Sequence, residues 1–218
     1  MVLAGRNSRI GDNMMLSKIR LYSELLNSID FTAWQELRAR WIQSPSDAGF
    51  LKYFDYEHQL NKTFEILDCI GWPDKPNNVL DISTGFGWLP FVLKHLGCKI
   101  TITDVNDEKN SMCQSVREFL SLPLTYKFKY EDGKFKPLPD TLIGFDLITA
   151  LSVGGQDDWK NGAWKHFISD GISRLNSGGK LFVYPNRSEN IIHLFRTAIE
   201  YSNVKIDKSK GWCLIWKD

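Results

Sequence analysis

Apolar residues recur at two different spacings along the chain, and the change between them falls near residue 71. Before this point, apolar positions lie three or four residues apart, which predicts helices. The expected helices are Leu16–Leu26, a stretch from Asp30 through Trp41, and about Asp47–Ile70. Turn-forming residues then fill Gly71–Asn78 (GWPDKPNN). We therefore expect a helical extension or lid over residues 1–70 and a separate main domain over residues 71–218.

The extension is rich in aromatic side chains. They are Phe31, Trp34, Trp41, Phe50, Tyr53, Phe54 and Tyr56. Two interpretations stay open at this point. The aromatic residues either pack the helices against the edge of a sheet or form a lid over a small substrate.

After residue 78, short apolar strands alternate with amphipathic helices. The expected strands are Val79–Ile82, Lys99–Thr103, Tyr126–Tyr130, Asp146–Val153 and Lys180–Tyr184, and the expected helices are Trp88–Leu96, Asp107–Leu120, Lys160–Leu175 and Glu189–Tyr201. Two final strands, Val204–Ile206 and Trp212–Trp216, are joined by a loop short enough to permit only an antiparallel hairpin. The pattern predicts an α/β domain with a Rossmann-like, seven-stranded, mostly parallel sheet that ends in a hairpin.

One strand–loop–helix–strand unit carries the candidate chemistry. It runs from Val79 to Asp104 and holds Gly85 and Gly87 in the loop after its first strand. Glycines allow a ligand to approach the backbone closely. An acid at the end of the second strand, here Asp104, can accept hydrogen bonds from both hydroxyls of a ribose. The combination predicts a site for a nucleoside-containing cofactor.

Two residues argue against a dinucleotide in this site. A dinucleotide fingerprint requires a third glycine three residues after the second, and this chain has Pro90 there. Asp81 lies beside the loop, where a carboxylate is unfavourable next to a pyrophosphate. A carboxylate at that position suits the cationic amino-acid end of S-adenosylmethionine.

From Val79 onward the sequence resembles the class I S-adenosylmethionine-dependent methyltransferases. The first motif of that family resembles the run from Val79 to Gly87 (VLDISTGFG), in which Ser83 replaces the first glycine. The turn into the fifth strand (LNSGGKLFV) and the closing hairpin are also similar to the family. The resemblance implies a methyltransferase with S-adenosyl-L-methionine as its cofactor.

The resemblance also implies roles for individual residues. Asp81 helps to hold the methionine amino group, Gly85 and Gly87 pass under the cofactor, and Asp104 takes the ribose. The acidic turn YEDG places Asp132 near the adenine amino group. The full set of cofactor-binding residues implied in this way is Asp81, Ser83, Gly85, Gly87, Asp104, Val105, Asp132, Gly133 and Leu151.

Composition and charge argue against several other functions, and the argument against a nucleic-acid enzyme is weak because a local basic patch could still form. The net charge of +1 gives no overall field that would attract nucleic acid or an anionic membrane. No stretch approaches the roughly 20 apolar residues of a membrane span. None of Cys69, Cys98, Cys113 and Cys213 forms a CxxC pair, so we expect reduced thiols in a cytoplasmic protein and no metal site.

The acceptor is the least determined part of the prediction. A sulfonium methyl group is already activated, so the protein must mainly align donor and acceptor, and the sequence assigns no catalytic residue. The chain after the fourth strand, residues 152–159, lacks the Asn/Asp-Pro-Pro-aromatic run of members that methylate exocyclic amines. We therefore expect a small-molecule acceptor. Asp157 and Asp158 are expected to form a solvated loop rather than a metal site.

Two alternatives remain. An RNA or protein methyltransferase would use a docking stripe made of Lys127, Lys129, Lys134 and Lys136. A relative that binds the cofactor without transferring its methyl group is the other, and Ser83 is the only residue that supports it. A dehydrogenase is disfavoured by Pro90 and by the terminal hairpin.

Overall fold

The computed structural model describes residues 6–43, 45–75, 77–104, 111–123, 126–127, 137–153, 159–185 and 188–218. The chain forms two compact units, Met1–Lys62 and Thr63–Asp218. The division falls within helix α3 (Tyr56–Ile70), whereas the boundary expected from the sequence followed that helix. The function of the first unit as a lid stays a prediction.

The first unit is helical. It contains α1 (Arg6–Ser28), α2 (Phe31–Trp41), a 3₁₀ segment η1 (Pro45–Tyr53) and the start of α3. The carboxylate of Asp30 caps α2 by accepting a hydrogen bond from the backbone N–H of Ala33 at 3.0 Å. The prediction for the first helix was too short, since α1 begins ten residues before Leu16.

The single helix predicted over Asp47–Ile70 was wrong. The chain forms η1 and then begins α3 at Tyr56. The carboxylate of Asp55 accepts a hydrogen bond from the backbone N–H of His58 at 3.0 Å, which caps the first turn of α3 and so favours a new helix start there.

The aromatic residues of the first unit fall into a packed set and an exposed set. The indole N–H of Trp34 donates to the carbonyl of Phe54 at 3.1 Å, and the two rings lie 5.4 Å apart. Both side chains are buried. Phe31 and Phe50 are exposed instead. Packing therefore accounts for some of these aromatic residues and leaves others facing solvent.

The second unit is built on one mixed sheet. Its strands are β1 (Asn78–Ile82), β2 (Lys99–Asp104), β3 (Tyr126–Lys127), β4 (Phe145–Val153), β5 (Leu175–Pro185), β6 (Val204–Asp207) and β7 (Trp212–Trp216). Their order is β3-β2-β1-β4-β5-β7-β6. The first five pair in parallel, and β7 runs antiparallel to both β5 and β6. The mostly parallel sheet and its closing hairpin are confirmed. Among the described residues, six strands have four or more residues, and β3 is a two-residue pairing at the edge.

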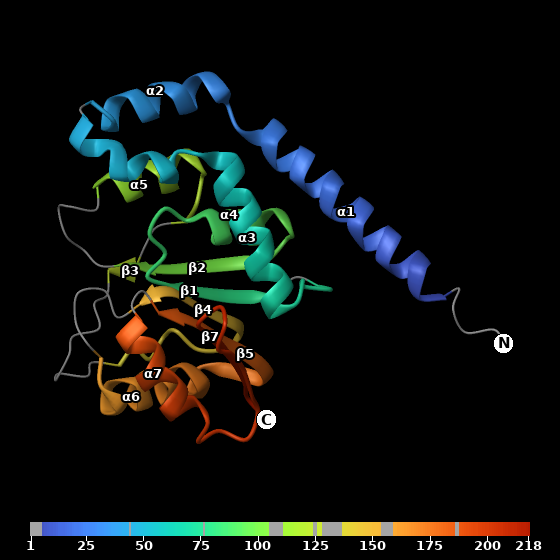
Figure 1. The fold of residues 1–218 in the computed structure, drawn as a ribbon, viewed down its shortest axis with the longest axis vertical. Helices are drawn as coiled ribbons and strands as arrows, with labels where there is room; N and C mark the ends of the chain where they lie inside the picture. Colours follow the sequence, from blue (N-terminus) through green and yellow to red (C-terminus); the bar gives the residue numbers. More distant parts are fainter. Residues whose placement is uncertain are drawn as a thin grey trace. The chain divides into compact units, whose positions relative to one another are not determined.

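Helices cover both faces of this sheet. They are α4 (Trp88–His95), α5 (Ser111–Phe119), α6 (Asn161–Ser173) and α7 (Ser188–Ala198). Figure 1 shows α4 and α5 on one face and α6 and α7 on the other, as a doubly wound fold requires. No helix in the described part of the chain is both long enough and apolar enough to span a membrane.

Two helix ends differ from the prediction. The helix expected to reach Leu175 ends at Ser173, and Leu175 opens β5 by pairing with Phe145. Buried Arg174 lies between them and donates to backbone carbonyls, which fixes the transition from helix to strand. The helix expected to reach Tyr201 ends at Ala198. The helix expected from Asp107 is described only from Ser111 onward.

Candidate cofactor site

The loop between β1 and α4 has a backbone conformation that favours glycine. Ser83, Gly85 and Gly87 have φ angles of 60°, 54° and 84°. The backbone N–H of Thr84 donates to the carbonyl of Thr103 at 3.2 Å, which attaches the loop to β2. The left-handed conformation costs a non-glycine residue about 1–2 kcal/mol. Ser83 therefore takes a conformation that glycine adopts freely, at the cost of local strain.

Gly87 has no space for a side chain. It is buried and precedes the first residue of α4. A Cβ atom built on it would lie 2.4 Å from Leu122 Cδ1 and 3.1 Å from Arg117 Cγ. Gly85 differs, because a Cβ atom there would meet nothing within 4 Å among the described residues. The loop thus fixes one glycine against α5 and leaves the backbone of the other accessible to a ligand.

Asp81 is buried near the end of β1. It pairs across the sheet with Thr149 of β4, whose hydroxyl donates a short hydrogen bond to Asp81 Oδ1. Burial raises the pKa of Asp81 to about 7, and the nearby Asp104 adds to this rise, while hydrogen bonds from Thr149 and Thr84 oppose it. A cation placed beside Asp81 would favour its ionised form. The resemblance implied that Asp81 binds the ammonium group of the cofactor. That role stays a prediction.

Asp104 ends β2 and is also buried. Its Oδ2 accepts a hydrogen bond from Nη1 of Arg117 at 2.6 Å, and the side chains of the two residues are 4% and 7% exposed. The same Nη1 donates to the carbonyl of Gly85 at 2.5 Å. The residue expected to bind ribose is therefore held in an ion pair that also contacts the glycine loop.

The structure brings together Asp81, Ser83, Gly85, Gly87 and Asp104 at the carboxyl edge of the sheet. Leu151 lies half-buried in β4, next to Ser152, whose φ of 58° is the same left-handed conformation as that of Ser83. The other predicted residues, Val105, Asp132 and Gly133, lie outside the described residues. So do Asp157, Asp158, Lys129, Lys134 and Lys136.

Sequence reasoning missed two residues of this site, Thr149 and Arg117. Each had a signal in the sequence. Thr149 is a polar residue within the otherwise apolar core of the predicted fourth strand. Arg117 lies four residues after Cys113 and three before Leu120, so helical spacing puts it on a stripe that faces the sheet.

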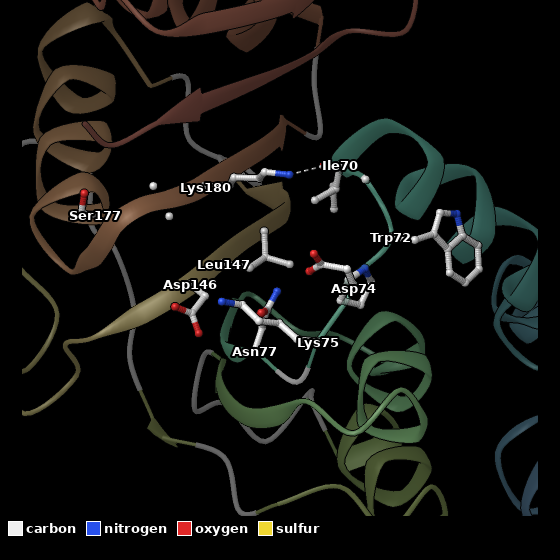
Figure 2. Close-up of a pocket in the computed structure, with 13 residues that line it drawn as sticks. Ile70, Trp72, Asp74, Lys75, Asn77, Asp146, Leu147, Ser177 and Lys180 are labelled. Carbon is white, nitrogen blue, oxygen red and sulfur yellow. Dashed lines mark hydrogen bonds between the residues drawn. The ribbon is translucent and has the colours of Figure 1, made fainter. Parts of the chain in front are cut away.

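The opposite, amino edge of the sheet carries a cavity of about 210 Å³. Figure 2 shows Lys180 reaching across this cavity toward Ile70, with Asn77, Asp146 and Leu147 at the starts of the strands. Lys180 Nζ donates to the carbonyl of Ile70 at 3.1 Å. Asp146 accepts hydrogen bonds from the backbone N–H of Asn78 and from Asn176 Nδ2, both at 2.8 Å. Lys180 and Asp146 are thus hydrogen-bonded within the protein and hold chain segments together at this edge.

Solved structures of other proteins share this fold. A methyltransferase from Pyrococcus furiosus matches 72% of this chain and 82% of its own, with 20% sequence identity and a TM-score of 0.51. The precorrin-6y C5,15-methyltransferase from Geobacter metallireducens matches 74% of this chain and 88% of its own, with 14% identity and a TM-score of 0.53. No protein-family model and no curated protein matches the sequence. The chain has the fold of the class I S-adenosylmethionine-dependent methyltransferases.

Proposed function

We propose that this protein is an S-adenosylmethionine-dependent methyltransferase that transfers the methyl group to a small-molecule acceptor by in-line attack. The observation that carries the proposal is the arrangement of the carboxyl edge. Two buried aspartates, Asp81 and Asp104, end neighbouring strands, and a glycine loop with left-handed backbone lies between them. In folds of this kind, ligands bind outside the carboxyl ends of the strands.

The residues present fit the cofactor. Accessible backbone at Gly85 allows a ligand to approach closely, and a Cβ atom on Gly87 would clash with Leu122, which follows α5. Asp81 is positioned to bind the ammonium group of the cofactor, because a cation offsets the cost of burying its charge. Asp104 is positioned to accept hydrogen bonds from the ribose hydroxyls. The cofactor would supply an electrophilic methyl group on a sulfonium.

The proposed work of the protein in the reaction is alignment. Orientation of two reactants can contribute about 7–11 kcal/mol toward the barrier. The strand ends and the helix-anchored loop are rigid elements that can hold one reactant in a fixed position. An acidic or basic catalytic group is required only where the acceptor retains its proton. We accordingly propose no general base.

Mass spectrometry of the purified protein under native conditions tests the cofactor. We expect S-adenosylmethionine or S-adenosylhomocysteine to be retained, or to bind when added. Incubation with methyl-labelled cofactor and pools of small metabolites, RNA or protein then tests the acceptor class. Label in a small metabolite supports the proposal. Label only in RNA or protein would overturn the acceptor part, and cofactor binding without any transfer would indicate a non-catalytic relative.

We further propose that the helical extension contributes to acceptor selection. The supporting observation is its exposed apolar set, Phe31, Phe50 and Leu51. Replacing Phe31 and Phe50 with serine should leave folding and cofactor binding unchanged and should lower transfer to the acceptor. The matched change Trp34→Ser affects a buried residue and should lower stability instead. Full transfer activity in the Phe31/Phe50 double variant would contradict this role.

A further inference from the structure

Arg117 connects three segments that form the carboxyl edge. It belongs to the last turn of α5, and its Nη1 donates both to Asp104 at the end of β2 and to the carbonyl of Gly85 in the glycine loop. Its aliphatic stem passes 3.1 Å from the position of a Cβ atom on Gly87. A single side chain thus contacts the residue expected to bind ribose and both glycines of the loop.

A second buried arginine in the same unit shows what a structural ion pair looks like. Arg174 bonds to Asp170 through Nε and Nη2, and it donates to the carbonyls of Leu138, Pro139 and Leu142. Its guanidinium therefore uses all three of its nitrogens. Its partners are Asp170 in α6 and the carbonyls of the segment that precedes β4, so this arginine holds two parts of the fold together.

The hydrogen bonding of Arg117 differs from that of Arg174. The Nε of Arg117 is buried and has no hydrogen-bond partner among the described residues. Its hydrogen bonds to Asp104 and to the carbonyl of Gly85 both come from Nη1 and go to groups that the cofactor would contact. Burial of a charge is unfavourable unless it is paired and hydrogen-bonded. An arginine that tolerates incomplete hydrogen bonding is expected where its position serves a ligand.

We propose that Arg117 is a positioning residue for the cofactor: it orients the Asp104 carboxylate toward the ribose and fixes the glycine loop through the carbonyl of Gly85. This inference rests on the proposed function. The planar guanidinium suits the task because it donates in fixed directions to two acceptors at once. The ammonium of lysine is a point charge on a flexible stem, so it keeps the charge and loses the fixed geometry.

The test compares Arg117→Lys with the matched control Arg174→Lys. Calorimetry would measure the affinity of each protein for S-adenosylhomocysteine and for its 2′-deoxy analogue, and thermal unfolding would measure stability. For Arg117→Lys we expect the affinity for S-adenosylhomocysteine to fall about tenfold, with a smaller loss for the analogue, because part of the lost interaction passes through Asp104 to the ribose hydroxyl. Arg174→Lys should lower the unfolding temperature and leave both affinities within about twofold of wild type.

Two results separate this inference from the proposed function. If the wild-type protein does not bind S-adenosylhomocysteine, the proposed function fails and the inference falls with it. If wild type binds and folded Arg117→Lys keeps its affinity, or loses both ligands equally, only the positioning role is overturned. Should Arg117→Lys fail to fold, the double variant Asp104→Asn/Arg117→Gln leaves no unpaired charge. We expect it to fold and to lose the preference for the ribose 2′-hydroxyl, and a retained preference would overturn the role.

Discussion

Asp146 at the amino edge of the sheet and Asp81 at the carboxyl edge have pKa values shifted in opposite directions. At the amino edge, hydrogen bonds from Asn176 and from the backbone of Asn78 lower the pKa of Asp146. At the carboxyl edge, burial raises the pKa of Asp81 to about 7. The backbone differs as well, since Ser83 and Ser152 take left-handed conformations at the carboxyl edge.

This difference separates polar groups that stabilise the fold from polar groups that would bind a ligand in the same sheet. Polar groups that serve stability are fully paired and keep their charge readily, as at Asp146. At Asp81 burial opposes ionisation in the protein alone, so a cationic ligand would favour its charge, and strain persists where a ligand site requires a particular backbone. A cavity alone does not identify a ligand site, because at the amino edge Lys180 and Asp146 already have hydrogen-bond partners within the protein.

The largest effect is expected for Asp104→Asn at the carboxyl edge, compared with the matched change Asp146→Asn at the amino edge. Asp104→Asn should lower the affinity for S-adenosylhomocysteine by about 10- to 100-fold, because hydrogen bonds to a charged acceptor contribute about 1.5–3 kcal/mol. It should also destabilise the fold by about 3–5 kcal/mol, because buried Arg117 loses its counter-charge. Calorimetry and chemical denaturation measure the two losses.

Asp146→Asn is the matched change at the amino edge. It should reduce the free energy of unfolding by about 1 kcal/mol and leave cofactor affinity unchanged. The comparison between the edges breaks down if Asp146→Asn weakens cofactor binding as much as Asp104→Asn does.

Asp81→Asn should have opposite effects on stability and binding. Because its folded pKa of about 7 exceeds the ordinary value of 3.8, Asp81 holds a proton in the folded state that the unfolded chain releases above about pH 4. The stability contributed by this group is therefore present below pH 4 and lost as pH rises toward 7. At pH 8 the variant should be more stable than wild type by up to about 4 kcal/mol, because each unit of the pKa difference corresponds to about 1.4 kcal/mol, while at pH 4 the two should be similar.

The same variant should bind the cofactor more weakly, because the carboxylate that attracts the ammonium group is gone. Thermal unfolding at pH 4 and pH 8, with and without S-adenosylhomocysteine, measures both effects. Lower stability of Asp81→Asn at pH 8 would show that burial of this charge is compensated in the unliganded protein, contrary to our account.

Gly87→Ala should disturb the loop and α5 together. The residue has a φ of 84°, and its Cβ atom would meet Leu122 and Arg117. We expect a loss of about 1–3 kcal/mol in stability, together with weaker cofactor binding. Gly162→Ala in α6 is the control, since a Cβ atom there meets nothing within 4 Å. That variant should fold and bind normally, and equal behaviour of the two variants would remove Gly87 from the site.

The smallest effect is expected at Ser83. Ser83→Gly should stabilise the protein by about 0.5–1 kcal/mol, because relief of the left-handed strain outweighs the greater freedom of glycine in the unfolded chain. Ser121, with a φ of 52°, offers the matched change outside the loop. Ser121→Gly should stabilise similarly without affecting the cofactor. A destabilised Ser83→Gly protein would mean that the serine hydroxyl stabilises the loop.

The sequence was most informative where one local pattern determined the structure. Alternation of strands and helices predicted the parallel sheet, and the short polar loop before Trp212 predicted the hairpin. The motif placed Asp81 and Asp104 at strand ends, where the structure has them. The break between η1 and α3 was missed because a single side-chain cap at Asp55 decided it against an apolar pattern that continues through it.

The ion pair between Arg117 and Asp104 could not be predicted from a local sequence pattern. Arg117 and Asp104 are 13 residues apart, and their contact depends on how α5 packs against β2 and the loop. The same holds for Thr149 and Asp81, which meet only because β1 and β4 are neighbours in a particular register. Tertiary contacts of this kind determine which groups the two buried aspartates bond to, whereas the motif determines only which residue types are available.

Calorimetric titration of the wild-type protein with S-adenosylhomocysteine and with NAD, at pH 6 and at pH 8, tests the central claim most directly. The claim is that the carboxyl edge binds S-adenosylmethionine through an ionised Asp81. We predict that S-adenosylhomocysteine binds about tenfold more weakly at pH 6 than at pH 8, with proton release at the lower pH, because a group with a pKa of about 7 must ionise to hold the ammonium. NAD should not bind. Tighter binding of NAD than of S-adenosylhomocysteine, or affinity for S-adenosylhomocysteine that is independent of pH and of Asp81→Asn, would contradict the account.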